Sequence, residues 1–135
     1  MERVDIIGQV ATAKSLSRIL SAIPLTQRGP PIELIYDIHA LQEQFYFGDG
    51  VVPVLATAIP ILTESVLPSL GDSADVSFAF PDEGAYKRFS RLLPKEYPWI
   101  ICKKVRNGNS REVIITEGIP VGKKILIIDD LVQTG

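Results

Sequence analysis

Apolar residues recur along the chain with two different spacings. In three segments the spacing is helical, which predicts helices over about residues 10–22, 59–70 and 84–93. Pro24 follows the first of these segments, and Pro60 lies in the first turn of the second, where proline is tolerated. The face expected to be buried in the first helix carries Val10, Ala13, Leu16, Ile19, Leu20 and Ile23.

Short apolar runs alternate with these helices. They predict strands over residues 32–36, 76–80, 99–103 and 124–128. The last run, Ile125-Leu126-Ile127-Ile128, is continuously apolar. Continuous runs are typical of parallel strands that are buried on both faces between layers of helices. The pattern therefore predicts an α/β fold with one mainly parallel sheet, in which 124–128 is a central strand.

One segment departs from this alternation. Asn107-Gly108-Asn109 separates two runs of β-forming residues, and Asn-Gly is a strong signal for a hairpin turn. Residues 103–116 are therefore expected to form a projecting antiparallel hairpin. Lys104 and Arg106 are two residues apart, so on a strand they would point to one side and could bind a polyphosphate. The alternative is a solvated hairpin edge, where lysines prevent edge pairing.

Acids or a histidine follow three of the four predicted parallel strands. His39 comes after the first, Asp82 after the second, and Asp129 and Asp130 after the last. Ligands of open α/β sheets bind beyond the carboxyl ends of the strands. Carboxylates there can hold Mg²⁺ or accept hydrogen bonds from sugar hydroxyls. Acidic residues are also common at strand ends because they suit turns, and a lone histidine is often structural.

Composition and charge limit the class of protein. The 135 residues are enough for one domain or part of one, and the net charge of −2 gives no general attraction to nucleic acid or to a membrane. No apolar run approaches the roughly 18 residues of a membrane span, and no targeting segment is recognisable. With one cysteine, Cys102, no internal disulfide forms. A cytoplasmic protein without nucleic-acid or membrane partners is expected.

Charge is unevenly distributed within the chain. Residues 84–124 contain ten of the fourteen Lys and Arg residues but only three acids. A basic stretch beside acidic clusters suits a highly charged anionic ligand whose metal ions the acids hold. Solvated loops and helix faces would give the same distribution.

Four motifs together resemble the ribose-phosphate pyrophosphokinase family, and most of all its divergent plant-like branch. They are the segments Asp37-Ile38-His39-Ala40-Leu41-Gln42, Pro81-Asp82-Glu83-Gly84-Ala85-Tyr86-Lys87-Arg88, Lys104-Val105-Arg106 and Ile127-Ile128-Asp129-Asp130-Leu131-Val132-Gln133-Thr134-Gly135. They occur in the family's order and spacing. The resemblance implies a three-layer phosphoribosyltransferase-like fold with a projecting flag hairpin. Since the family has two such domains, residues 1–135 are expected to be a single partial domain.

The resemblance also implies roles for individual residues. His39 and Asp82 would bind ATP and its Mg²⁺, and Lys104 and Arg106 would steady the transferring phosphates. Asp129 and Asp130 would hold the hydroxyls of ribose 5-phosphate. Thr134 and Gly135 would begin the turn that binds its phosphate.

The implied reaction moves the β,γ-diphosphoryl group of ATP to C1 of ribose 5-phosphate, giving phosphoribosyl pyrophosphate and AMP. Intact members of the family are oligomers, so a homo-oligomer is expected, and this chain by itself is expected to be inactive. Two alternatives remain. A type I phosphoribosyltransferase would share the last motif. A catalytically silent regulatory homologue would account for Gln133, where many members have aspartate.

Overall fold

The chain is a mixed α/β protein with mainly parallel strand pairing. The computed structural model describes residues 6–107 and 110–132, and no side chains are described for residues 106–111. The chain divides into two compact units, residues 1–58 and residues 59–135. The strands form two separate sheets rather than the single sheet that the sequence predicts. The assignment of 1–135 to one partial domain stays a prediction.

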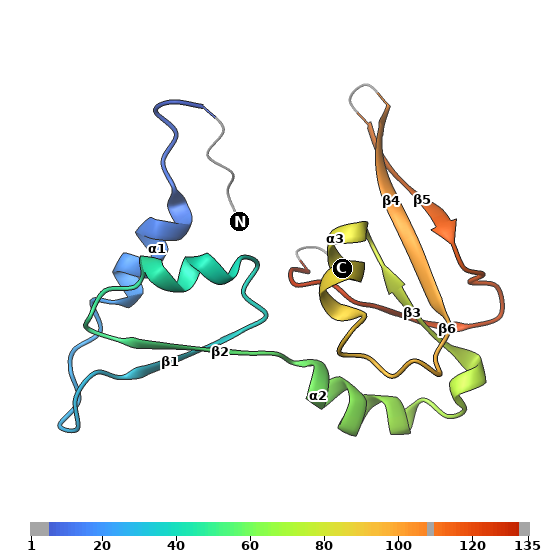
Figure 1. The fold of residues 1–135 in the computed structure, drawn as a ribbon, viewed down its shortest axis with the longest axis horizontal. Helices are drawn as coiled ribbons and strands as arrows, with labels where there is room; N and C mark the ends of the chain where they lie inside the picture. Colours follow the sequence, from blue (N-terminus) through green and yellow to red (C-terminus); the bar gives the residue numbers. More distant parts are fainter. Residues whose placement is uncertain (1–5, 108–109, 133–135) are drawn as a thin grey trace. The chain divides into compact units, whose positions relative to one another are not determined.

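Unit 1 contains a two-stranded parallel sheet. Strand β1 (Ile32–Tyr36) pairs with β2 (Val52–Ala56) along its whole length. Helix α1 (Thr12–Leu20) contacts the 3₁₀ helix η1 (Leu41–Tyr46), as Figure 1 shows in blue and blue-green. The helix and the first strand confirm the sequence prediction. Strand β2 was missed because Pro53 lies inside it, and proline argues against an interior strand.

Unit 2 is built on a four-stranded sheet in the order β5-β4-β3-β6. Its strands are β3 (Val76–Phe80), β4 (Trp99–Asn107), β5 (Ser110–Glu117) and β6 (Lys124–Ile127). The middle strand β3 pairs in parallel with both β4 and β6. Every residue of β3 is buried, which confirms that this apolar run lies in the core.

The prediction that residues 124–128 form a central strand is wrong. In the described part of the chain β6 lies at the edge of the sheet, and 37% of Ile125 and 69% of Ile127 are exposed. Continuous apolar character therefore did not indicate burial on both faces here. Ile128, one residue beyond the strand, is buried in the core, and Leu126 packs against the core from the strand.

Helical segments cover the core of unit 2. Helix α3 (Glu83–Phe89) packs against β3 and β4 and ends four residues before the predicted boundary. The predicted helix over 59–70 is present as successive short helices of α, π and 3₁₀ type: α2 (Ile59–Ile61), η2 (Leu62–Val66) and η3 (Leu67–Ser69). A further 3₁₀ turn, η4 (Ser73–Asp75), precedes β3. No helix in the described ranges is long and apolar enough to cross a lipid bilayer.

Aromatic rings make up much of this core. The rings of Phe80, Tyr86 and Trp99 meet edge to face in all three pairings, with centroids 5.4–6.2 Å apart. Such contacts add about 1 kcal/mol per pair to the burial of the rings. The ring cluster joins β3, β4 and α3, and so it fixes the start of α3 relative to the ends of the strands.

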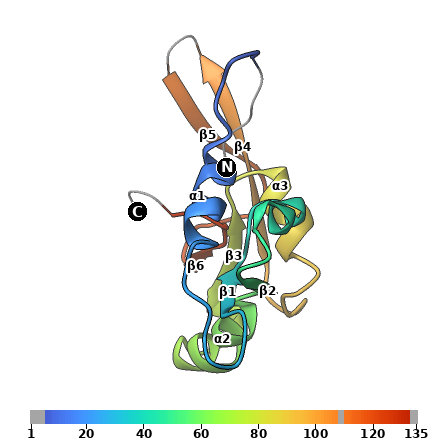
Figure 2. The same ribbon diagram turned by 90° about the vertical axis from the view of Figure 1, so that its left-hand side faces the viewer.

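Strands β4 and β5 form the predicted antiparallel hairpin. Only Trp99, Ile100 and Ile101 of β4 pair with β3, so the rest of β4 leaves the sheet together with β5. Figures 1 and 2 show this hairpin in orange, projecting past α3. The register shifts between Ile101 and Cys102, where the hydroxyl of Thr116 donates a hydrogen bond to the carbonyl oxygen of Ile101. The shift leaves Thr116 of β5 without a paired residue on β4, and it lies where the hairpin leaves the sheet.

Gly118 permits a close crossing after the hairpin. Its φ is +89°, and a Cβ there would lie 2.3 Å from the carbonyl oxygen of Trp99 and 2.9 Å from the Cα of Ile100. Both atoms belong to the backbone and cannot move aside independently. Glycine is therefore required for the chain to turn from β5 toward β6.

We expect Gly118→Ala to lower the free energy of unfolding by about 2 kcal/mol or more, because it combines an unfavourable φ with a backbone clash. Urea denaturation of the purified chain measures this loss. Gly122→Ala is the matched control, since Gly122 also has a positive φ of +74° but nothing lies within 4 Å of the added Cβ. Equal losses in both variants would show that the crossing at Gly118 is not tightly packed.

Candidate functional site

Strand register brings three acids to one edge of the sheet in unit 2. Ala79 of β3 is paired with Ile127 of β6, and Phe80 is paired with Ile101 of β4. Asp82 lies two residues beyond Phe80, and Asp129 lies two residues beyond Ile127. The carboxyl ends of these parallel strands therefore converge, as the sequence predicts for Asp82, Asp129 and Asp130.

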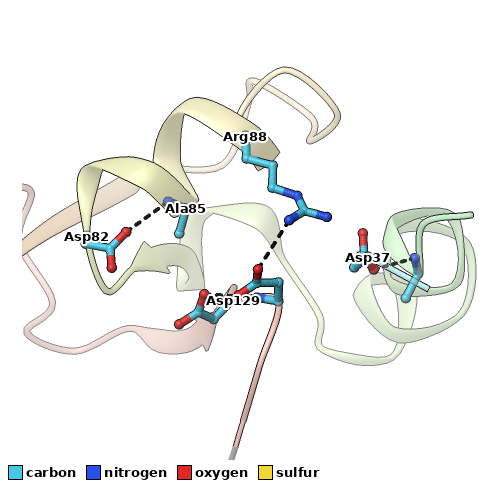
Figure 3. Close-up of polar contacts among 7 residues, drawn as sticks. Asp37, Asp82, Ala85, Arg88 and Asp129 are labelled. Atoms are coloured by element: carbon cyan, nitrogen blue, oxygen red, sulfur yellow. Dashed lines mark hydrogen bonds and ion pairs between the residues drawn. The ribbon is translucent and has the colours of Figure 1, made fainter. Parts of the chain in front are cut away.

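Asp82 is the N-cap of α3. Its Oδ1 accepts a hydrogen bond of 3.0 Å from the backbone N–H of Ala85, which Figure 3 shows. Aspartate is favoured at this position because its carboxylate satisfies a free N–H group and faces the positive end of the helix. One carboxylate oxygen is thus committed to the fold, and Oδ2 is turned toward the hairpin.

Lys104 meets Asp82 from the hairpin. Its Nζ lies 2.8 Å from Oδ2 of Asp82, and about half of the lysine side chain is exposed. Lys104 lies three residues beyond Ile101, the last residue of β4 that pairs with β3. It therefore reaches the end of the sheet where Asp82, Asp129 and Asp130 lie, which we call the acid edge. The pKa of Asp82 is lowered, chiefly by the hydrogen bond from Lys104 and next by the one from Ala85.

Asp129 and Asp130 form a close pair after β6. The N–H of Asp130 donates a hydrogen bond of 2.9 Å to Oδ1 of Asp129. Burial raises the pKa of Asp129, and the neighbouring Asp130 carboxylate adds to the rise. The charge of Lys104 acts in the opposite direction, so this lysine influences both Asp82 and Asp129. Ionising both carboxylates at once is unfavourable, so the pair suits a ligand that brings hydrogen-bond donors or cations.

The structure adds Arg88 to this group. Its Nη1 lies 3.2 Å from Oδ2 of Asp130, in the most buried of the described ion pairs of α3 and the acid edge. Figure 3 shows the guanidinium extending from α3 toward the aspartate pair. Arg88 belongs to one of the four family motifs, but the sequence pattern assigns it no role. Its position six residues after Asp82, on the helix that Asp82 caps, is the only feature of the sequence that would place it near the acids.

His39 belongs to unit 1, where it is exposed and follows β1. Its neighbour Asp37 has a structural role: Oδ2 accepts a hydrogen bond from the N–H of Ala58 (Figure 3). The N–H of Asp37 donates a hydrogen bond to the carbonyl oxygen of Ala56. Asp37 has a φ of +48°, which aspartate tolerates better than most residues. These bonds join the ends of β1 and β2, so they fix the backbone that leads into His39. The predicted role of His39 in binding ATP and Mg²⁺ stays a prediction.

The structure describes only the backbone of one predicted site residue and does not describe two others. The backbone of Arg106 lies on β4 opposite Arg111, which agrees with a strand position two residues beyond Lys104, but its side chain is not described. Thr134 and Gly135 lie outside the described residues. Their roles stay predictions.

Comparison with known proteins identifies the relatives of the chain. It is 53% identical over 134 residues to Ribose-phosphate pyrophosphokinase 4 of Oryza sativa subsp. japonica. It is 49% identical over 134 residues to the mitochondrial Ribose-phosphate pyrophosphokinase 3 of Spinacia oleracea, and 32% identical over 130 residues to the Ribose-phosphate pyrophosphokinase of Sulfurisphaera tokodaii. No protein-family model matches. The chain belongs to the ribose-phosphate pyrophosphokinase family, in its plant-type branch.

These matches cover nearly all of this chain but much less of its relatives. They include 99% of the chain for the rice and spinach proteins and 91% for the archaeal one. The chain spans 41% of the rice protein and 32% of the spinach protein. The spinach protein is named as mitochondrial, and the cytoplasmic location expected for this family member stays a prediction.

The acid edge does not form a metal site by itself. Among residues 6–107 and 110–132 no group of three or more His, Cys, Asp or Glu side chains could hold a metal ion. Mg²⁺ commonly uses one or two carboxylates and completes its shell with water and substrate phosphates. Oδ1 of Asp82 caps α3 and Oδ2 pairs with Lys104, so a magnesium ion that binds Asp82 would share Oδ2 with the lysine or displace it.

A cavity of about 460 Å³ lies elsewhere, in unit 1. None of its lining residues is a predicted site residue; they are Lys14, Arg18, Ser21, Ala22, Phe45, Tyr46, Phe47 and Gly48. We place the candidate site at the acid edge of unit 2 rather than in this cavity, because there three carboxylates and two cations from four elements converge.

We expect Asp129→Asn to raise the free energy of unfolding at pH 7. The folded state binds the Asp129 proton more tightly than the unfolded state does, so ionised Asp129 opposes folding at neutral pH. Asparagine removes the charge but keeps an oxygen that accepts the N–H of Asp130. Urea denaturation at pH 7 measures the difference, which decreases as the pH falls through the raised pKa of Asp129. A loss of stability at pH 7 would contradict the assigned charge state.

For Asp82→Asn we expect the opposite sign. The folded pKa of Asp82 is lowered, so its charge stabilises the fold above its ordinary value of 3.8, and this contribution is lost as the pH falls through the lower folded pKa. Asparagine still caps α3 and loses only the interaction with Lys104, which is about 1 kcal/mol or less because the pair is partly exposed. Denaturation at pH 7 and near pH 3 measures the difference. Asp82→Ala, which also removes the cap, is the control and should lose about 1 kcal/mol more.

Proposed function

We propose that the chain is part of a ribose-phosphate diphosphokinase. The protein would transfer the β,γ-diphosphoryl group of Mg²⁺-bound ATP to the C1 hydroxyl of ribose 5-phosphate, giving phosphoribosyl pyrophosphate and AMP. One observation carries the proposal: Asp82, Lys104 and the Asp129–Asp130 pair converge at the carboxyl edge of the sheet in a chain 53% identical to a protein named for this activity.

The proposed division of roles follows from the chemistry of each group. Asp129 and Asp130 accept hydrogen bonds from the ribose hydroxyls, and they are adjacent, so they suit neighbouring hydroxyls of one sugar. Lys104 and Arg106 meet the phosphates that move. Thr134 and Gly135 would begin the binding turn for the 5-phosphate. His39 and Asp82 bind ATP and its metal ion.

Mg²⁺, when bound, would draw charge from the phosphate oxygens of ATP as they are transferred. Asp82 would supply an oxygen to it, and on the family resemblance His39 is proposed to bind ATP and Mg²⁺. The remaining work of the protein is positioning and the placement of positive charge. Lys104 lies at the base of the hairpin, where its positive charge would stabilise the diphosphoryl group during its transfer from ATP to the sugar.

The proposal extends to fold and assembly. Unit 2 is consistent with the three-layer phosphoribosyltransferase-like fold, since it has a mainly parallel sheet, a covering helix and a projecting flag hairpin. ATP and ribose 5-phosphate are the proposed substrates. A homo-oligomer is proposed for the intact protein on the family resemblance.

Because the chain spans 41% of the rice relative, we would test activity in a chimera. The 134 aligned residues of rice Ribose-phosphate pyrophosphokinase 4 are replaced by those of this chain, and the unmodified rice protein is the control. The assay follows AMP formation from ATP and ribose 5-phosphate. Pyrophosphate release that depends on a nucleobase would instead favour a phosphoribosyltransferase. Binding of ATP without AMP formation would favour a silent regulatory homologue.

Within the chimera, we expect Lys104→Ala to lower kcat by about 10²–10³-fold, because a cation placed at developing charge acts mainly in the transition state. The KM for ATP should change little. Lys103→Ala is the matched control, since Lys103 precedes Lys104 on β4 and its side chain points to the other side of the strand. Unchanged turnover in Lys104→Ala would remove this residue from the proposed mechanism.

A further inference from the structure

A cation from α3 contacts Asp130. The guanidinium of Arg88 contacts Asp130 at 3.2 Å, with 28% of the arginine side chain and 13% of the aspartate side chain exposed. The neighbouring pair on α3, Lys87 with Glu83, has 73% and 69% exposed. Exposed pairs contribute little, whereas a partly buried charge that loses its partner is left uncompensated. The Arg88–Asp130 contact is therefore the more consequential of the two.

The geometry of α3 explains how Arg88 reaches the acid edge. The helix begins at Asp82, and side chains of a helix lean toward its N-terminus. Arg88 lies five residues after the first helical residue, about 7.5 Å along the axis, which an arginine side chain can span. The carbon Cζ also lies 4.9 Å from the ring centroid of the buried Phe89, so the guanidinium is packed as well as paired.

The Arg88–Asp130 contact offsets the repulsion between two adjacent carboxylates. The N–H of Asp130 donates a hydrogen bond to Asp129, so two carboxylates lie side by side just after β6. Without a counter-charge they would repel each other. Arg88 meets Asp130 on one side, and Lys104 acts on Asp129 from the hairpin.

From these contacts we infer that Arg88 is a positioning residue for ribose 5-phosphate binding, which acts by fixing the carboxylate of Asp130. This inference rests on the proposed function and adds a residue to it. Arg88 would act on the sugar through Asp130, whose carboxylate its Nη1 contacts while Cζ packs over the ring of Phe89. It sets the orientation of the acceptor for the sugar hydroxyls, and it takes no part in ATP binding.

The chimera with the rice protein tests this role through the two substrates separately. Arg88→Met should raise the KM for ribose 5-phosphate by about tenfold or more, as expected for the loss of a charge-assisted hydrogen bond that orients an acceptor. The KM for ATP should stay within about twofold. Arg88→Lys, which keeps the charge and most of the reach, should recover part of the loss. Lys87→Met is the matched control on α3 and should leave both values unchanged.

A double variant separates action through Asp130 from direct contact with the substrate. In an Asp130→Asn background, Arg88→Met should change the KM for ribose 5-phosphate by no more than about twofold, because the carboxylate that Arg88 orients is already altered. A full effect in that background would show that Arg88 meets the substrate itself and would overturn the inference.

The remaining outcomes are also distinguishable. If the unmodified chimera forms AMP and Arg88→Met leaves the KM for ribose 5-phosphate unchanged, the inference fails and the proposed function stands. If the unmodified chimera forms no AMP while the rice protein does, the proposed function fails and the inference fails with it. Should Arg88→Met not fold, as judged by circular dichroism, Arg88→Lys and Arg88→Gln provide the same comparison.

Discussion

The candidate site depends on the balance of charge at the edge of one sheet. Register between three strands brings Asp82, Asp129 and Asp130 together, and such a group is unfavourable without compensation. Lys104 comes from the hairpin and Arg88 comes from α3, so each cation belongs to a different element from the acid it meets. The same contacts that make the acids tolerable also join the hairpin and the helix to the strand ends. The contacts that stabilise this part of the fold are therefore also the ones on which the proposed site depends.

Much of this arrangement could be read from the sequence. The buried run at 76–80, the Asn-Gly turn signal of the hairpin and the acids after the strands each rest on a local rule, and each led to the right element. Because parallel strands end at one edge, Asp82, Asp129 and Asp130 could be placed together before any coordinates were known. Lys104 was likewise expected at the base of the hairpin.

The remaining features depend on tertiary structure. Strand order places β6 at an edge, which an apolar run such as Ile125–Ile128 does not reveal. Strand β2 contains Pro53 and is recognisable only through its pairing with β1. The role of Arg88 depends on the direction in which α3 leaves the acid edge, since residues 88 and 130 are far apart in the sequence. His39 follows β1 in the other unit, so its predicted role rests on the family resemblance alone.

The register shift opposite Ile101 and Cys102 divides β4 into two parts that tolerate change differently. Before the shift, Trp99, Ile100 and Ile101 pair with β3, and beyond it β4 pairs only with β5. Insertions beyond Arg106 would lengthen the hairpin without disturbing Lys104, whereas one inserted residue between Cys102 and Lys104 would turn the cation to the opposite side of the strand. Among relatives, variation in hairpin length should accordingly be confined to the far side of Lys104.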